Sequence, residues 1–200
     1  MKLFYAPGAC SLAPHIVLRE AGLDDVGLVK VAFGKDRPTE DGRNFYDINP
    51  QGAVPALELD DGEVLTEAQV LMQYLAALNP KAGLAITDGP QHWRFLETLN
   101  FIATELHKGT SPLFRSNPEE VKEAAKANLV NRYKLLDQKL GDKDYLLGQF
   151  TVADAYAFVV LSWAKRFEVS LPPKLDAYFA RVRARPAGQK ALQEEGLPTS

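Results

Sequence analysis

The spacing of apolar residues changes near residue 80, and this change constrains the fold more than any other feature of the sequence. Before residue 80, short apolar runs typical of strands alternate with helical patterns, whereas every later pattern has helical spacing. Residues 81–89 contain two glycines and no strong periodicity, which is typical of a linker. We therefore predict an α/β domain over residues 1–80 and an all-α domain over residues 87–200.

The first domain is predicted to have the element order βαβαββα. Its strands are expected at residues 2–6, 26–33, 54–59 and 64–65, and its helices at residues 12–21, 43–48 and 67–77. Asp60-Asp61-Gly62 is a hairpin signal between the last two strands. Thr66 is expected to cap the third helix.

The second domain is predicted to contain only helices, at residues 90–108, 117–140, 151–163, 174–185 and 187–195. Gly109 is expected to end the first of these helices, and Asn117 to cap the second. Thr151 and Asp154 have the spacing of a capping box. Because the helix that follows them is apolar nearly all round, we expect it at the buried centre of the domain.

The charge and hydropathy of the chain exclude several classes of protein. The chain has 200 residues, 46% of them hydrophobic, and a net charge of −3. This mild acidity gives no reason to expect nucleic acid or an anionic membrane as a partner. No apolar stretch reaches the ~18 residues of a membrane span, and the short apolar run at the N-terminus is no secretory signal. We therefore expect a cytoplasmic globular protein.

Cys10 lies where the first predicted strand gives way to the first predicted helix. It is the only cysteine, so no intrachain disulfide or multi-cysteine metal site can form. The backbone N–H groups and the dipole at a helix N-terminus favour a thiolate, which is the nucleophilic form. The alternative is that Cys10 is a small buried hydrophobic residue. Its position alone leaves both interpretations open.

Pro55 stands at the start of a predicted strand. Proline cannot donate to a sheet, so an ordinary strand start explains it. Alternatively, a cis Val54-Pro55 bond would turn the backbone N–H and C=O of Val54 outward, where they can pair with an extended peptide ligand.

Glu67 lies at the start of the third predicted helix. An acid there is commonly explained by the helix dipole. A sharper interpretation is that the N–H groups of Glu67 and Ala68 hold a ligand carboxylate while the Glu67 side chain holds the ligand amino group.

Taken together, these segments resemble the glutathione transferases, most closely the bacterial beta class. The resemblance covers nearly the whole chain. It rests on KLFY (residues 2–5), PGACSL (7–12), VPAL (54–57), LTE (65–67), NFIATELHKG (100–109) and TVADAY (151–156). It implies a thioredoxin-like first domain, an all-helical second domain, glutathione as a substrate in the cleft between them, no tightly bound cofactor or metal, and a homodimer.

The resemblance also implies roles for individual residues. Cys10 and His107 are the expected catalytic residues, with Cys10 approaching the glutathione sulfur. The backbone of Val54 is expected to pair with the cysteinyl unit, and Lys35 with the glycine carboxylate. Glu67 and Ala68 are expected to hold the γ-glutamyl end. The remaining glutathione-binding candidates come from one helix: Asn100, Thr104, Glu105, Leu106 and His107.

The helix that holds His107 has two neighbouring stripes. An apolar core stripe consists of Trp93, Leu96, Leu99, Ile102 and Leu106. Asn100, Thr104 and His107 form a polar stripe beside it, which is either a solvated edge or part of a cleft. Phe114, Trp163 and Phe167 are candidates for a pocket for the second substrate, or else ordinary core residues.

The function we expect is transfer of glutathione to small hydrophobic electrophiles, thiol–disulfide exchange through Cys10, or both. The rival hypothesis is a non-catalytic protein of the same fold that serves as a binding or assembly module. Retention of Cys10, Val54-Pro55 and Glu67 favours the enzyme.

Overall fold

The computed structural model describes residues 1–199 and divides them into two units. Unit 1 holds Met1–Ala85 together with the residues from Arg185 onward, and unit 2 holds Ile86–Ala184. The boundary between Ala85 and Ile86 lies near the change of apolar pattern at residue 80. The boundary between Ala184 and Arg185 was not expected, because the sequence predicted one continuous second domain from residue 87 to residue 200.

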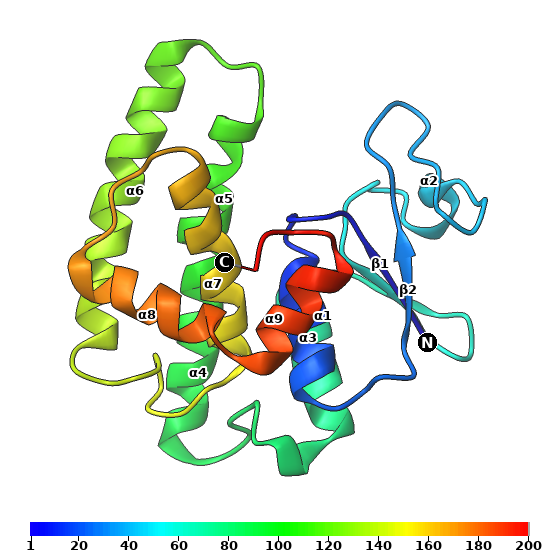
Figure 1. Ribbon diagram of the computed structural model, residues 1–200, viewed down its shortest axis with the longest axis horizontal. Helices are drawn as coiled ribbons and strands as arrows, with labels where there is room; N and C mark the ends of the chain where they lie inside the picture. Colours follow the sequence, from blue (N-terminus) through cyan, green and yellow to red (C-terminus); the bar gives the residue numbers. More distant parts are fainter. Residues whose placement is uncertain (200) are drawn as a thin grey trace. The chain divides into compact units, whose positions relative to one another are not determined.

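Unit 1 is built on a four-stranded sheet in the order β2-β1-β3-β4, of which Figure 1 labels β1 and β2. The strands are β1 (Lys2–Tyr5), β2 (Gly27–Lys30), β3 (Ala56–Glu58) and β4 (Val64–Leu65). β1 pairs in parallel with β2 and antiparallel with β3, and β3 pairs antiparallel with β4. The helices are α1 (Leu12–Glu20), α2 (Phe45–Ile48) and α3 (Ala68–Leu78), followed by the short 3-10 helix η1 (Pro80–Ala82). This confirms the predicted βαβαββα order and the thioredoxin-like fold.

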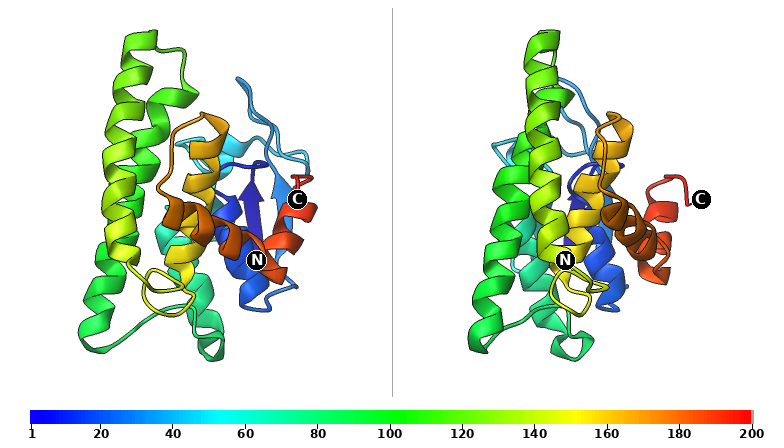
Figure 2. Two further views of the ribbon diagram at one scale, coloured as in Figure 1. Left: turned by 60° about the vertical axis from the view of Figure 1, so that its left-hand side comes forward. Right: turned by 90° about the vertical axis from the view of Figure 1, so that its left-hand side faces the viewer.

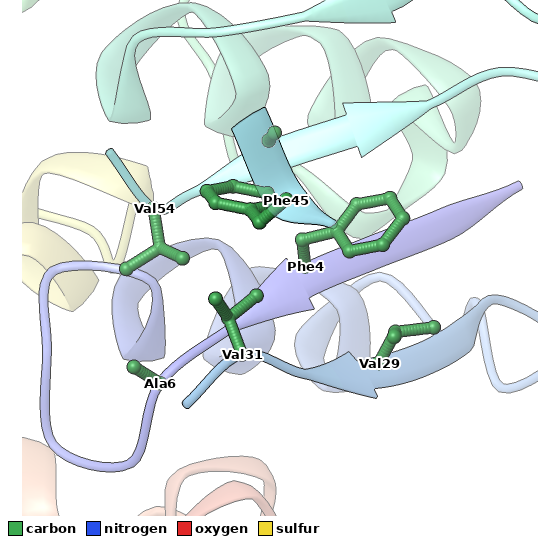
Figure 3. Close-up of a cluster of buried hydrophobic side chains, with 7 residues drawn as sticks. Phe4, Ala6, Val29, Val31, Phe45 and Val54 are labelled. Carbon is green, nitrogen blue, oxygen red and sulfur yellow. The ribbon is translucent and has the colours of Figure 1, made fainter. Parts of the chain in front are cut away.

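One face of the sheet is covered by a cluster of buried apolar side chains (Figure 3). Phe4 of β1 packs against Phe45 of α2, with 5.6 Å between the ring centroids. Val29 and Val31 come from β2 and the residue beyond it, and Val54 joins the cluster from the segment before β3. The cluster therefore fixes Val54 against the end of β1, where the segment carrying Cys10 begins.

Helix α1 is buried from Leu12 to Leu18 because other helices cover it on more than one side. It packs against α3 and against α9 (Pro186–Glu194), the last helix of the chain (Figure 1). Arg185, which precedes α9, holds both carboxylate oxygens of Glu20 at 2.6 and 2.8 Å. These contacts explain why the end of the chain belongs to unit 1.

Unit 2 is entirely helical, as predicted. The long helix α6 (Glu119–Leu140) lies alongside the segment that contains α4 and α5 (Figure 2). The remaining elements are α4 (Gly89–Phe101), η2 (Ile102–His107), α5 (Lys108–Thr110), η3 (Ser111–Phe114), α7 (Val152–Arg166) and α8 (Pro173–Arg183). Helix α7 is buried over most of its length and starts with the predicted capping box of Thr151 and Asp154. The prediction that α7 forms the buried centre is confirmed.

Two predicted helix boundaries in unit 2 are wrong. Gly109 does not end the first long helix, which passes through the π-helical segment η2 into α5. A Cβ atom at Gly109 would lie 3.2 Å from Cδ2 of Leu129, so glycine is explained here by the close approach of α6. Asn117 does not cap α6, because its side chain donates to the carbonyl of Pro112 and Pro118 takes the cap position.

Candidate functional site

Cys10 is held in a tight loop between β1 and α1. The buried hydroxyl of Ser11 accepts the N–H of Ala6 at 3.1 Å and donates to the carbonyl of the same residue at 3.2 Å. Ser11 therefore closes the loop on itself and places Cys10 directly before the first turn of α1.

The structure brings Cys10 and Val54 together, although 44 residues separate them. The Cys10 thiol donates a hydrogen bond to the carbonyl oxygen of Val54, with Sγ and O 3.0 Å apart. The Val54-Pro55 peptide bond is cis, which is the second of the two possibilities considered for Pro55.

Of the two interpretations of Cys10, the shift of its pKa favours the buried thiol over the thiolate. The backbone N–H groups of Cys10 and Ser11 do lower this pKa, as a helix N-terminus should. Burial of the thiol has the larger effect and raises the pKa of Cys10 to about 12, and the charge of Glu67 raises it further. Cys10 is therefore a neutral thiol at pH 7, which agrees with its role as donor to Val54.

Glu67 occupies the N-cap position of α3, which corrects the prediction that Thr66 caps this helix. Its φ angle of 66° lies in the left-handed region, which is rare for a residue with a side chain. Its carbonyl accepts the N–H groups of Val70 and Leu71 at 2.9 and 3.0 Å. Non-glycine residues held in this conformation concentrate at functional sites, so the strained backbone at Glu67 marks the start of α3 as a candidate site.

Ala68 is buried at the first position of α3, while the side chain of Glu67 is exposed. Together with Cys10 and Val54, these residues form the part of the candidate site that lies in unit 1. Lys35 lies exposed in the loop after β2. Within residues 1–199, the structure shows no hydrogen bond or ion pair that joins Lys35 to the other candidates.

The candidates from unit 2 lie around η2, a π-helical segment that the sequence did not predict. Thr104 is exposed and its hydroxyl donates to the carbonyl of Asn100 at 3.0 Å, so these two members of the polar stripe are neighbours. Glu105 forms an ion pair with Arg132 of α6 at 2.9 Å. Leu106 is fully buried, so its side chain belongs to the core of unit 2. Short π-helical segments occur frequently at functional sites.

His107 is the last residue of η2, and its Nδ1 atom lies 2.6 Å from the hydroxyl oxygen of Tyr156. Burial lowers the pKa of His107 to about 4, and the charge of Lys108 adds to this shift. The imidazole is therefore neutral at pH 7. A neutral imidazole that accepts the Tyr156 hydroxyl at Nδ1 carries its own proton on Nε2, where it can serve as a hydrogen-bond donor.

Beyond His107, aromatic side chains continue through unit 2 in what we name the aromatic row: His107, Trp163, Phe114 and Phe167. Successive ring centroids along this row are 5.0, 5.2 and 4.8 Å apart. The structure thus groups the three aromatic residues that we considered for a substrate pocket. Trp93, which we expected in the core, is 69% exposed, because the buried face of α4 is formed by Phe95 and Leu99.

Two residues that contact the aromatic row were missed as functional candidates. Tyr156 lies within the TVADAY segment, but nothing in the sequence indicates that its hydroxyl meets a histidine 49 residues away. Arg166 lies next to Phe167 in the sequence, and its guanidinium carbon is 5.7 Å from the ring centroids of both Phe114 and Phe167. The sequence signal for Arg166 was its place beside the aromatic candidate Phe167, beyond the end of the predicted helix 151–163.

Comparison with known proteins identifies the family. Residues 8–78 match the N-terminal domain of glutathione S-transferases, and residues 101–186 match the C-terminal domain. Glutathione S-transferase GstA from Escherichia coli O157:H7 is 47% identical over 202 residues, which cover 98% of this chain and 100% of the relative. The chain belongs to the glutathione S-transferase family.

Solved structures of other glutathione S-transferases are closely similar to this one. A sphingomonad glutathione S-transferase in complex with glutathione has a TM-score of 0.93 and 44% identity, covering 99% of this chain and 100% of that one. The beta class enzyme of Sphingomonas chungbukensis has a TM-score of 0.91 and 43% identity, with the same coverage. The family and its bacterial beta class, which the sequence motifs indicated, are thus confirmed.

In this glutathione S-transferase, the candidate site residues form one group in each unit. Unit 1 supplies Cys10, Val54, Glu67 and Ala68, and unit 2 supplies His107 and its aromatic neighbours. Within residues 1–199, no three His, Cys, Asp or Glu side chains form a group that could hold a metal ion. Over the same residues, no helix is long and apolar enough to cross a membrane.

Proposed function

We propose that this protein binds glutathione and transfers it to small hydrophobic electrophiles. The observation that carries the proposal is the hydrogen bond between the Cys10 thiol and the Val54 carbonyl, next to the cis Val54-Pro55 bond. This pair lies in a chain 44% identical to a sphingomonad transferase whose structure contains glutathione.

The γ-glutamyl end of glutathione is proposed to bind at the start of α3. The N–H groups of Glu67 and Ala68 are suited to the carboxylate of this unit, because a helix N-terminus favours an anion. The exposed Glu67 carboxylate is suited to the amino group. The backbone of Val54 is proposed to pair with the cysteinyl unit, and Lys35 with the glycine carboxylate. Asn100, Thr104, Glu105, Leu106 and His107 are further glutathione contacts that we propose from the family resemblance.

The neutral state of Cys10 favours conjugation as the main reaction. When glutathione is bound, the single S–H of Cys10 can turn from the Val54 carbonyl to the glutathione sulfur and so stabilise its thiolate. That sulfur then forms a bond to the electrophilic carbon, the leaving group departs with its electron pair, and the thiol proton of glutathione passes to solvent. Exchange of disulfides through Cys10 needs a Cys10 thiolate, which its raised pKa disfavours.

Two properties are proposed together with this activity. We propose a homodimer, which light scattering at micromolar concentration would detect. We also propose the cytosol as the compartment, because glutathione keeps thiols reduced there.

Immobilised glutathione followed by a turnover assay separates the enzyme from a non-catalytic module. We expect retention on the resin and glutathione-dependent turnover of chlorodinitrobenzene. Retention without turnover of any member of a panel of aryl halides, epoxides and mixed disulfides would favour a binding or assembly module.

A further inference from the structure

Arg166 is the last residue of α7 and lies at one end of the aromatic row. Its guanidinium carbon is 5.7 Å from the ring centroid of Phe114 and 5.7 Å from that of Phe167. The two rings are 4.8 Å apart and nearly perpendicular, at 85°. A guanidinium packed against two rings is restrained in position while its N–H groups can still bind an anion.

The charge of Arg166 is not balanced by a neighbouring carboxylate. The side chain is exposed, and the structure shows no ion pair between it and any acidic residue within residues 1–199. This includes Glu168, the acidic residue nearest to it along the chain. Lys165, the preceding residue, differs in this respect because it is paired with Asp176.

The aromatic row connects this cation to His107. At the Arg166 end, Phe114 is 48% exposed, whereas Trp163 in the middle of the row is buried. His107, at the other end, can donate a hydrogen bond from Nε2 if Tyr156 occupies Nδ1. The aromatic row thus has a hydrogen-bond donor at one end and, beside the exposed ring of Phe114, a permanent positive charge at the other.

We propose that Arg166 binds the carboxylate of aromatic electrophiles at the Phe114 and Phe167 end of the aromatic row, so that anionic aromatic substrates are preferred over neutral ones. The aromatic ring of the substrate packs against Phe114, and its carboxylate pairs with the guanidinium. Arg166 is then a specificity-determining residue. Preferred turnover of such substrates rests on the proposed conjugating activity, whereas preferred binding does not.

The test compares neutral chlorodinitrobenzene with its carboxylate derivative, chlorodinitrobenzoate. In both reactions the glutathione sulfur bonds to the ring carbon, the carbon–chlorine bond breaks, chloride leaves and the thiol proton passes to solvent. For each protein the readout is the ratio of kcat/KM for the anionic substrate to kcat/KM for the neutral one. Intrinsic reactivity cancels when this ratio is compared between the original protein and a variant.

We expect Arg166→Gln to lower this ratio about 3- to 5-fold, the range of a partly exposed ion pair. Arg166→Lys should restore part of the ratio, because it keeps the charge. Lys165→Gln is the matched control: it removes one positive charge from the adjacent position, and we expect no change in the ratio. Raising the salt concentration to about 0.5 M should lower the ratio of the original protein, because salt screens exposed charges.

Binding of the two glutathione conjugates, measured by titration calorimetry, gives the same comparison without turnover. Tighter binding of the carboxylated conjugate that is lost in Arg166→Gln supports the inference even if no turnover is found, and the missing turnover then contradicts only the proposed function. An equal preference in the original protein and in Arg166→Gln, by kinetics or by calorimetry, overturns the inference and leaves the conjugating activity intact.

Discussion

A carboxylate oxygen of Glu195 accepts the backbone N–H of Gly8 at 2.9 Å, although 187 residues separate them in the chain. The other carboxylate oxygen lies 2.9 Å from Nδ1 of His15 in α1, and both side chains are fully buried. The residue after α9 therefore holds the loop that precedes Cys10 and the helix that follows it.

Replacement of Glu195 should destabilise unit 1. Glu195→Ala removes the carboxylate that accepts the N–H of Gly8 and faces Nδ1 of the buried His15 ring, so we expect a loss of about 3 kcal/mol in the free energy of unfolding. Urea unfolding measures this loss. Lys190→Ala on the same helix removes an exposed ion pair with Asp24 and should have a much smaller effect. Equal effects of the two substitutions would contradict a buried structural role for Glu195.

The raised pKa of Cys10 should be visible in its alkylation by iodoacetamide. We expect the rate to rise with pH through pH 9 without reaching a plateau, because burial raises the pKa of this thiol to about 12. The same shift predicts that stability falls as pH rises from about 8.5, where an unfolded cysteine loses its proton, toward the folded-state value. Cys10→Ser should lose less stability over this interval. An alkylation midpoint near pH 7 would show that Cys10 is a thiolate after all.

The lowered pKa of His107 predicts the opposite dependence of stability on pH. In the unfolded chain His107 gains its proton near pH 6.5, whereas the folded protein resists protonation down to about 4. The contribution of His107 to the free energy of unfolding is therefore complete above pH 6.5 and is lost as pH falls toward 4. Between pH 7 and pH 4.5 we expect it to fall by about 2–3 kcal/mol. Urea unfolding at the two pH values should show a smaller fall in His107→Gln, and equal falls would argue against a buried neutral imidazole.

Tyr156→Phe tests whether the hydroxyl of Tyr156 positions His107. Without this hydrogen bond, the ring of His107 can rotate and its proton is no longer held on Nε2. We therefore expect kcat for conjugation to fall about 5-fold with little change in KM for glutathione. The matched control is Tyr145→Phe, a substitution in the loop before α7. If kcat of Tyr156→Phe stays unchanged while its stability falls, the hydroxyl is structural only.

Local sequence signals predicted the order of elements and the parts of the site that depend on a single turn or loop. The capping box of Thr151 and Asp154 and the position of Cys10 before α1 are examples. The sequence left open whether Cys10 is a thiolate or a buried thiol, because the helix N-terminus acts locally, whereas burial comes from tertiary packing. The residues next to a cysteine in the sequence do not show whether distant parts of the chain will bury it.

Two further features could not be predicted from the sequence, for different reasons. The π-helical segment η2 has nearly the same apolar pattern as an α-helix, so periodicity could not distinguish it. Helix α9 has an apolar face that the sequence does show, but an apolar face does not identify the partner that covers it. Its packing on α1 therefore appeared only in the structure.

The discontinuous make-up of unit 1 has a consequence for synthesis on the ribosome. Its sheet, α1 and α3 are translated first, but α9 follows only after all of unit 2. Until then, one side of α1 stays uncovered and the N–H of Gly8 lacks the carboxylate of Glu195. Unit 2, whose residues are contiguous, is complete earlier. We therefore expect nascent chains to finish folding out of order, with the second half of the protein becoming native before the half that carries Cys10.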